Sequence, residues 1–260
     1  MSFERAGNIV NVHGVEIEVD IRGSGAPVFI LPSEEDWESD HPLVEELAKT
    51  RKVVIAYPPG FGRSARPDWI THPDDHAYVM LDLVEQLGLQ GAALVGFSMG
   101  GWIAAEMATK DDSLFSKLVL VDAFGVKIGG PSDVDIQDIW IQHPEKVAAL
   151  KWADPQNGKR DFGSWSDAAL AVVARNTESF ARFGWEPYMH NPKLRHRLHR
   201  VGVPATVIWG EKDGVVTTSY GKAYAALIPG AKFETIAGAG HFPHVEQPQA
   251  FAKALVAALA

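Results

Sequence analysis

Short apolar runs alternate with amphipathic segments along most of this chain. The run 26–31 (APVFIL) has no charged position, which is typical of a parallel strand buried on both faces. Similar runs predict strands at 52–57, 92–96, 117–122, 204–210 and 231–238. Residues 9–22 differ, because apolar and polar residues alternate there around His13–Gly14. That alternation predicts a β-hairpin.

The segments between these strands have apolar residues at helical spacing. In 74–89, Val79, Leu83 and Leu87 fall on one face, and Gly88 is placed where a helix would end. Further helices are predicted at 41–50, 101–110, 217–228 and 248–260. Strands that alternate with helices predict a mostly parallel sheet covered on both faces. In such sheets ligands bind beyond the carboxyl ends of the strands.

The alternation stops between residues 125 and 200. This stretch has no buried-strand run and carries four irregularly spaced tryptophans. We therefore expect a core formed by residues 1–124 and 201–260, with residues 125–200 inserted as a helical cap over one edge of the sheet.

Composition excludes several function classes. The chain has 260 residues and a net charge of −9, whereas phosphate binding needs clustered Lys and Arg, so we expect no nucleic-acid partner. The absence of cysteine removes disulfides and thiol catalysis. No leader-like apolar segment begins the sequence and no run approaches 18 apolar residues, so we expect a cytoplasmic protein without a membrane partner.

The stretch LVGFSMGGW (94–102) places Ser98 between a predicted strand and a predicted helix, with glycines on either side. A serine on such a sharp bend is held out as a nucleophile, while small neighbours let the helix approach the strand. A serine hydroxyl needs a base to take its proton and a carboxylate to orient that base.

Two later strands are followed by suitable partners. Asp213 comes just after the strand at 204–210, and His241 follows the strand at 231–238 in a glycine-rich loop. Asp122, at the end of the strand 117–122, is an alternative acid or a carboxylate that stabilises a loop. His244 is an alternative base or a surface or supporting histidine.

Four stretches, PPGFGRSARP, GFSMGG, WGEKDGVV and GHFPHVEQP, occur in the order found in α/β-hydrolases. The sequence resembles the serine-hydrolase branch near carboxylesterases, enol-lactonases and carbon–carbon bond hydrolases. That resemblance implies an eight-stranded, mostly parallel sheet with a helical cap after the sixth strand. It also implies a Ser98–His241–Asp213 triad, and it favours His241 over His244 because the base directly follows the glycine. The backbone amide of Met99 is then half of an oxyanion hole.

The loop expected to supply the second oxyanion amide departs from the family pattern. Pro32 and Ser33 stand where relatives carry His-Gly, and Glu34 is placed to offer its amide. A carboxylate ~5 Å from an oxyanion would cost roughly 3 kcal/mol at an effective dielectric of about 20. We expect the side chains of Glu34 and Glu35 to point to solvent. The alternatives are a glutamate that is paired, protonated or bound to a cationic or hydroxylated part of the substrate, and a chain that hydrolyses nothing.

The leading hypothesis is a serine hydrolase that cleaves a small ester or lactone through an acyl-enzyme. Its acyl pocket is predicted to be apolar or aromatic, and the candidate lining residues are Phe97, Trp102, Trp37 and Trp140. No cofactor motif is present, and neither a metal nor an organic cofactor is expected. The alternatives are a carbon–carbon bond hydrolase with the same triad and a non-catalytic binding protein on a hydrolase scaffold.

Overall fold

The computed structural model describes residues 7–35 and 41–260. Within these residues, one eight-stranded sheet has the order β1-β2-β4-β3-β5-β6-β7-β8. The strands are β1 (Asn8–Val12), β2 (Val15–Arg22), β3 (Ala26–Leu31), β4 (Arg51–Ala56), β5 (Ala92–Phe97), β6 (Phe115–Val121), β7 (Ala205–Gly210) and β8 (Lys232–Ile236). The pairs β1–β2 and β2–β4 are antiparallel and the others are parallel. The predicted mostly parallel sheet is confirmed.

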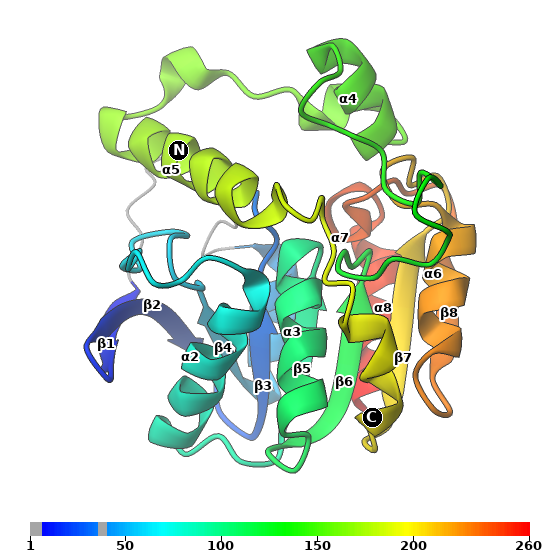
Figure 1. Ribbon diagram of the computed structural model, residues 1–260. Helices are drawn as coiled ribbons and strands as arrows, with labels where there is room; N and C mark the ends of the chain where they lie inside the picture. The colour runs from blue at the N-terminus through cyan, green and yellow to red at the C-terminus, as the bar shows by residue number, and fades with distance from the viewer. Residues whose placement is uncertain (1–6, 36–40) are drawn as a thin grey trace.

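Helices cover both faces of the sheet (Figure 1). The α-helices are α1 (Pro42–Ala48), α2 (Pro73–Gln86), α3 (Met99–Lys110), α4 (Pro144–Lys151), α5 (Asp167–Gly184), α6 (Thr218–Ala226), α7 (Pro243–Glu246) and α8 (Pro248–Leu259), and the 3₁₀ helices are η1 (Pro155–Gly158), η2 (Phe162–Ser164), η3 (Leu194–His196) and η4 (Leu198–Arg200). Helices α2 and α3 pack together on one face, and α1 and α8 pack together on the other. Among the described residues, no helix has the length and apolar composition needed to span a bilayer.

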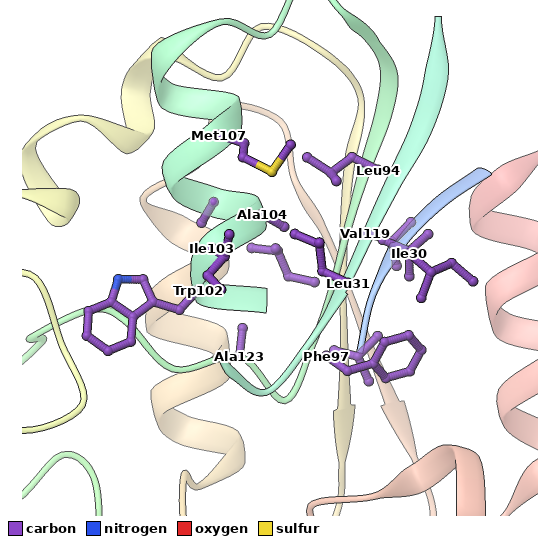
Figure 2. Packing of buried hydrophobic residues seen from close by; sticks show 14 of the residues in the cluster. Ile30, Leu31, Leu94, Phe97, Trp102, Ile103, Ala104, Met107, Val119 and Ala123 are labelled. Atoms are coloured by element: carbon purple, nitrogen blue, oxygen red, sulfur yellow. The ribbon is translucent and has the colours of Figure 1, made fainter. Parts of the chain in front are cut away.

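The core lies where the central parallel strands meet these helices. Leu31 in β3, Leu94 in β5 and Val119 in β6 are all fully or almost fully buried, and Figure 2 shows Leu31 and Leu94 facing Ile103, Ala104 and Met107 of α3. Each large apolar side chain buried in this way contributes about 1.5–3 kcal/mol relative to exposure. This layer fixes α3 against β5, and it therefore fixes the turn between them.

Residues 122–204, which we call the β6–β7 segment, contain α4, α5 and the four 3₁₀ helices. Figure 1 shows α4 and α5 above one end of the sheet. Two backbone hydrogen bonds attach the end of α4 to loops at the carboxyl edge: Gly214 N–H donates to Leu150 O at 2.9 Å and His241 N–H to Lys151 O at 2.7 Å. The helical insertion predicted after the sixth strand is confirmed, while the domain boundaries at 125 and 200 stay a prediction.

Candidate active site

Ser98 occupies the turn between β5 and α3 with φ of 51° and ψ of −115°. A non-glycine residue at positive φ costs about 1–3 kcal/mol and persists where the surroundings hold it. The glycines around it make that packing possible. A Cβ on Gly100 would lie 2.3 Å from Pro32 O, and one on Gly96 would lie 2.4 Å from Gly100 O. Glycine at these positions lets α3 approach the ends of β3 and β5.

A continuous chain of hydrogen bonds joins the three residues that the sequence singled out. Ser98 Oγ lies 2.8 Å from His241 Nε2, and His241 Nδ1 lies 2.7 Å from Asp213 Oδ2. A carboxylate can only accept, so Nδ1 carries a proton and Nε2 is left to accept from the serine hydroxyl. All three residues are buried. The structure therefore brings together Ser98, His241 and Asp213, the residues for which the sequence predicts the roles of nucleophile, base and orienting acid.

The orientation of this chain is set by backbone groups. Asp213 Oδ1 accepts hydrogen bonds from the amides of Val215 at 2.8 Å and Val216 at 3.1 Å, which leaves Oδ2 for His241. Lys151 O holds the backbone amide of His241 at 2.7 Å. Phe124 stacks on the His241 ring with centroids 5.1 Å apart. These contacts come from the loop after β7, the end of α4 and the loop after β6, and they limit rotation of the imidazole.

Asp122, the alternative acid, lies beside Asp213 without a hydrogen bond to His241. Its Oδ1 accepts from Gly210 N–H at 2.8 Å, which ties the end of β6 to the end of β7, and its Oδ2 has no hydrogen-bond partner among the described residues. Burial, and then the Asp213 carboxylate, raise the pKa of Asp122 well above 3.8. The geometry favours Asp213 as the acid and gives Asp122 the loop-stabilising role.

Asp122, Asp213 and His241 also place three potential metal-ligating atoms within 4.8 Å of one another. Hydrogen bonds account for this cluster, because both nitrogens of His241 already have partners, Ser98 and Asp213. A metal would have to break one of these two bonds. The donor set therefore fits proton transfer better than metal binding.

His244 is buried and packs between rings on the α8 side of the sheet. Its ring centroid lies 4.9 Å from that of Phe97 and 5.5 Å from that of His41. Burial, and then His41 and His241, lower the pKa of His244 well below 6.5. The surface position considered for this histidine is therefore wrong, because its ring fills the core beneath α8.

The two glutamates after β3 are also not where we expected them. Glu34 is 5% exposed, and Glu35 is partly buried between two cations of the β6–β7 segment. Glu35 Oε1 lies 2.8 Å from Lys151 Nζ, and Oε2 lies 2.8 Å from Arg160 Nη2. The prediction that both side chains point to solvent is wrong, because the β6–β7 segment covers this loop.

The backbone positions proposed for the oxyanion hole lie at one edge of the sheet. Met99 is the first residue of α3, and Glu34 is the third residue after β3. Strand β3 pairs with β5 up to Leu31 opposite Gly96. Both segments thus emerge at the carboxyl edge, next to Ser98.

A cavity of about 330 Å³ lies between the loop after β3 and the β6–β7 segment. Its charged lining consists of Glu34, Glu35, Lys151 and Arg160. Its aromatic lining consists of Trp140, Trp152, Phe162 and Phe180. Phe180 stacks on Phe124, which in turn stacks on His241, so the cavity lies close to the hydrogen-bonded chain. Of the four predicted pocket residues, Trp140 lines this cavity.

The other three predicted pocket residues do not contribute described side chains to the cavity. Phe97 and Trp102 are buried on opposite sides of β5 and α3, as Figure 2 shows. Phe97 faces Phe251 of α8 at 5.6 Å, and Trp102 meets the edge of His72 at 5.1 Å. A strand sends alternate side chains to opposite faces, and the sequence does not say which face carries a ligand. Trp37 lies outside the described residues.

Lys151, Arg160 and Phe180 border the cavity, and the sequence did not single them out. Each lies more than 100 residues from Glu34 and Glu35 along the chain, in a stretch without strong periodicity. The one feature of the sequence that could have pointed to Lys151 and Arg160 is charge, because two adjacent glutamates buried in a site need cations nearby. Several Lys and Arg between 125 and 200 could have met that need equally well.

Comparison with known families agrees with this geometry. The model of the α/β hydrolase fold family matches residues 26–248. The chain therefore belongs to the α/β hydrolase fold family. This match covers the core strands from β3 onward, all three members of the hydrogen-bonded chain and the whole β6–β7 segment.

Individual relatives include more than one kind of hydrolase. A 2-hydroxy-6-oxononadienedioate/2-hydroxy-6-oxononatrienedioate hydrolase from Paraburkholderia phymatum is 28% identical over 267 residues, which cover 94% of this chain and 86% of that protein. A meta-cleavage product hydrolase from Pseudomonas fluorescens superposes with a TM-score of 0.79 at 20% identity, covering 97% of each chain. A thermophilic esterase from Thermogutta terrifontis gives 0.73 at 21% identity, covering 98% of each chain. The two structural similarities concern the fold alone.

Proposed function

We propose that this hydrolase cleaves a small carboxylic ester or lactone through an acyl-enzyme on Ser98. The observation that carries the proposal is the hydrogen-bonded chain from Ser98 through His241 to Asp213, with 2.8 Å and 2.7 Å separations. These distances are within the range that proton transfer between a nucleophile and its base requires. The strained backbone at Ser98 supports the same role.

In this mechanism Ser98 Oγ attacks the carbonyl carbon while His241 Nε2 takes the hydroxyl proton. Asp213 keeps the imidazole in the tautomer that accepts at Nε2 and stabilises the imidazolium that forms. His241 then returns the proton to the leaving alkoxide, and the acyl group stays on Ser98. A water molecule, deprotonated by the same histidine, attacks the acyl-enzyme, and the proton goes back to Ser98 as the acid leaves.

The tetrahedral intermediates carry a negative charge on the former carbonyl oxygen. We assign its stabilisation to the backbone amides of Met99 and Glu34, at the start of α3 and after β3 respectively. Loss of one oxyanion donor costs about 2.7–4 kcal/mol in comparable enzymes. The dipole of α3 adds to this field, because Met99 stands at its N-terminus.

The test is hydrolysis of p-nitrophenyl esters from C2 to C12, together with mass spectrometry after treatment with a fluorophosphonate. Wild type is expected to hydrolyse the shorter esters and to gain one adduct at Ser98. Ser98→Ala is expected to lose the adduct and at least ~10³-fold of kcat. Ser113→Ala, at an exposed serine, is the matched control and should behave as wild type. Absence of both adduct and turnover would instead support a non-catalytic binding protein.

Carbon–carbon bond hydrolysis is the second candidate, and the relative from Paraburkholderia phymatum favours it by its name. The reaction uses the same nucleophile and base, so the hydrogen-bonded chain does not separate the two candidates. A vinylogous 1,5-diketone whose chromophore is lost on cleavage does separate them. Faster turnover of this diketone than of every ester in the series would assign the carbon–carbon activity.

A further inference from the structure

Glu34 is a buried carboxylate to which no described residue donates a hydrogen bond. It is 5% exposed, and neither Oε1 nor Oε2 has a hydrogen-bond partner among the residues that the structure describes. The nearest cation is Lys151, whose Nζ lies 3.9 Å from Oε1, beyond hydrogen-bond distance. Buried carboxylates normally accept several hydrogen bonds, and one left without a donor is costly.

Cations do lie near this loop, but they bind the adjacent Glu35. Lys151 and Arg160 each approach a different oxygen of Glu35 to 2.8 Å, so both oxygens have charged partners. Lys151 is thereby held to Glu35 and away from Glu34. Glu34 therefore accepts no hydrogen bond from these cations, because both Lys151 and Arg160 bind Glu35.

The Glu34 side chain lines the cavity of about 330 Å³, which is at the small end of the range for ligand pockets. The rest of the wall is largely aromatic, from Trp140 and Phe180 among others. Such a wall can hold a flat apolar group, and none of its described residues donates a hydrogen bond to Glu34. A ligand that fills the cavity therefore has to bring the donor itself.

The charges around the cavity favour a neutral donor. Two carboxylates, Glu34 and Glu35, face two cations, Lys151 and Arg160, so the formal charges of these four lining residues cancel. An ammonium group would be attracted by Glu34 but repelled by the nearby Lys151. A hydroxyl group donates to the carboxylate without that repulsion.

We propose that Glu34 determines substrate specificity by accepting a hydrogen bond from a hydroxyl group on an aromatic acyl part of the substrate. This inference rests on the proposed function, because the acyl-enzyme at Ser98 is what extends the acyl group into the cavity. The backbone amide of Glu34 then faces the reacting carbonyl, while its carboxylate accepts a hydrogen bond from the far end of the same acyl group.

The test compares esters that differ only in the donor. The three esters are p-nitrophenyl 3-phenylpropanoate, its meta-hydroxyphenyl analogue and its para-hydroxyphenyl analogue. The aminomethylphenyl analogue is the cationic counterpart. A hydrogen bond to a buried charged group is worth enough to raise kcat/KM about 10-fold or more for one hydroxyl isomer. The aminomethyl ester is expected to gain less than the better hydroxyl isomer. A larger gain for the ammonium would overturn the choice of a neutral donor.

Variants assign the effect to one side chain. Glu34→Met keeps the approximate volume and removes the acceptor, so the hydroxyl preference should fall to about 1 or below. Glu34→Gln retains a neutral acceptor and should keep part of it. Glu145→Met is the matched control at an exposed glutamate of α4 and should keep the full preference. Because each preference is a ratio within one protein, partial loss of folded enzyme does not affect it.

The same esters are also titrated into Ser98→Ala by calorimetry, which measures binding without turnover. Turnover of the parent ester without any hydroxyl preference would overturn the role of Glu34 and leave the serine hydrolase intact. No turnover, with tighter binding of a hydroxylated ester that Glu34→Met abolishes, would support Glu34 and overturn the proposed reaction. No turnover and equal binding of all the esters would overturn both.

Discussion

Ser98 adopts a backbone conformation that serine seldom takes, and the residues around it explain why it can. Gly100 lies against the carbonyl oxygens of Leu31 and Pro32, so α3 begins in contact with the end of β3. This contact holds the positive φ of Ser98, and it also brings the proposed oxyanion amides of Met99 and Glu34 to the same edge. The lack of a side chain at Gly100 therefore matters both for the stability of the fold and for the geometry of the site.

Gly100→Ala tests this contact. The new Cβ would lie 2.3 Å from Pro32 O and 2.4 Å from Leu31 O, so the start of α3 has to move. We expect a loss of about 1–3 kcal/mol in the free energy of unfolding, measured in urea. We also expect kcat for a p-nitrophenyl ester to fall more than KM changes.

Gly130→Ala is the control, because the atom nearest to its new Cβ is the flexible carboxylate of Asp133 at 3.3 Å. This variant should change the free energy of unfolding by less than about 0.5 kcal/mol. Equal stability of the two variants would contradict this account.

At the scale of elements, the end of α4 connects three loops that the site needs. Its last two carbonyl oxygens accept hydrogen bonds from the amides of Gly214 and His241. The side chain of Lys151 forms an ion pair with Glu35 after β3. Arg160, beyond η1, pairs with the other oxygen of Glu35. The β6–β7 segment is thus attached to the site by charge as well as by backbone hydrogen bonds.

Glu35→Gln removes the shared acceptor of this connection. Burial would raise the pKa of Glu35, but Lys151 and Arg160 outweigh it and hold the pKa below 4.5. A lowered folded-state pKa means that the contribution to stability is present above pH 4.5 and is lost as the pH falls through the folded-state value. We therefore expect the variant to be less stable than wild type by about 1–3 kcal/mol at pH 7. This difference should shrink toward pH 3.

Urea unfolding followed by tryptophan fluorescence at pH 7 and pH 3 measures both values for Glu35→Gln. Glu46→Gln is the control, because Glu46 forms an ion pair with Lys49 in which both side chains are exposed. The loss for this control should stay below about 1 kcal/mol. A difference between wild type and Glu35→Gln that stayed constant with pH would show that the ion pairs do not cause it.

At the scale of the whole molecule, the carboxyl edge of the sheet concentrates buried acidic groups. Asp122 and Asp213 are both buried, and they follow neighbouring strands β6 and β7. Their proximity helps raise the pKa of Asp122, and burial contributes more. The unfolded chain releases this proton near pH 3.8, while the folded chain retains it to higher pH. The unfolded state is therefore favoured increasingly as the pH rises from about 4 toward the folded-state pKa.

Asp122→Asn removes this titration and keeps an oxygen that accepts from Gly210 N–H. We expect the variant to gain stability relative to wild type as the pH rises from 4 to 8, in a series of urea unfolding curves. Asp68→Asn, at a fully exposed side chain, should follow wild type across the same range. A constant difference between Asp122→Asn and wild type would mean that the raised pKa of Asp122 makes no contribution to the stability of the fold.

Most elements and the three residues of the hydrogen-bonded chain could be predicted from the sequence alone. The strand at 26–31 coincides with β3, and the helix expected at 41–50 contains α1, because apolar period and turn residues are local properties. Strand β6 begins at Phe115, two residues earlier than predicted, since the polar Ser116 separates Phe115 from the predicted run at 117–122. Ser98, Asp213 and His241 could be found because each follows a recognisable strand, and parallel strands end at one edge.

The residues that surround the hydrogen-bonded chain could be identified only from the folded structure. Phe97 and Trp102 lie on opposite sides of β5 and α3, and this depends on which neighbours each side packs against. The burial of Glu34 and the pairing of Glu35 depend on where α4 and η1 pack, more than 100 residues away. Long-range packing of this kind leaves no periodic pattern in a single chain. The chemistry of the proposed reaction was therefore readable from local sequence, whereas the surroundings that select a substrate arise only when the β6–β7 segment folds onto the sheet.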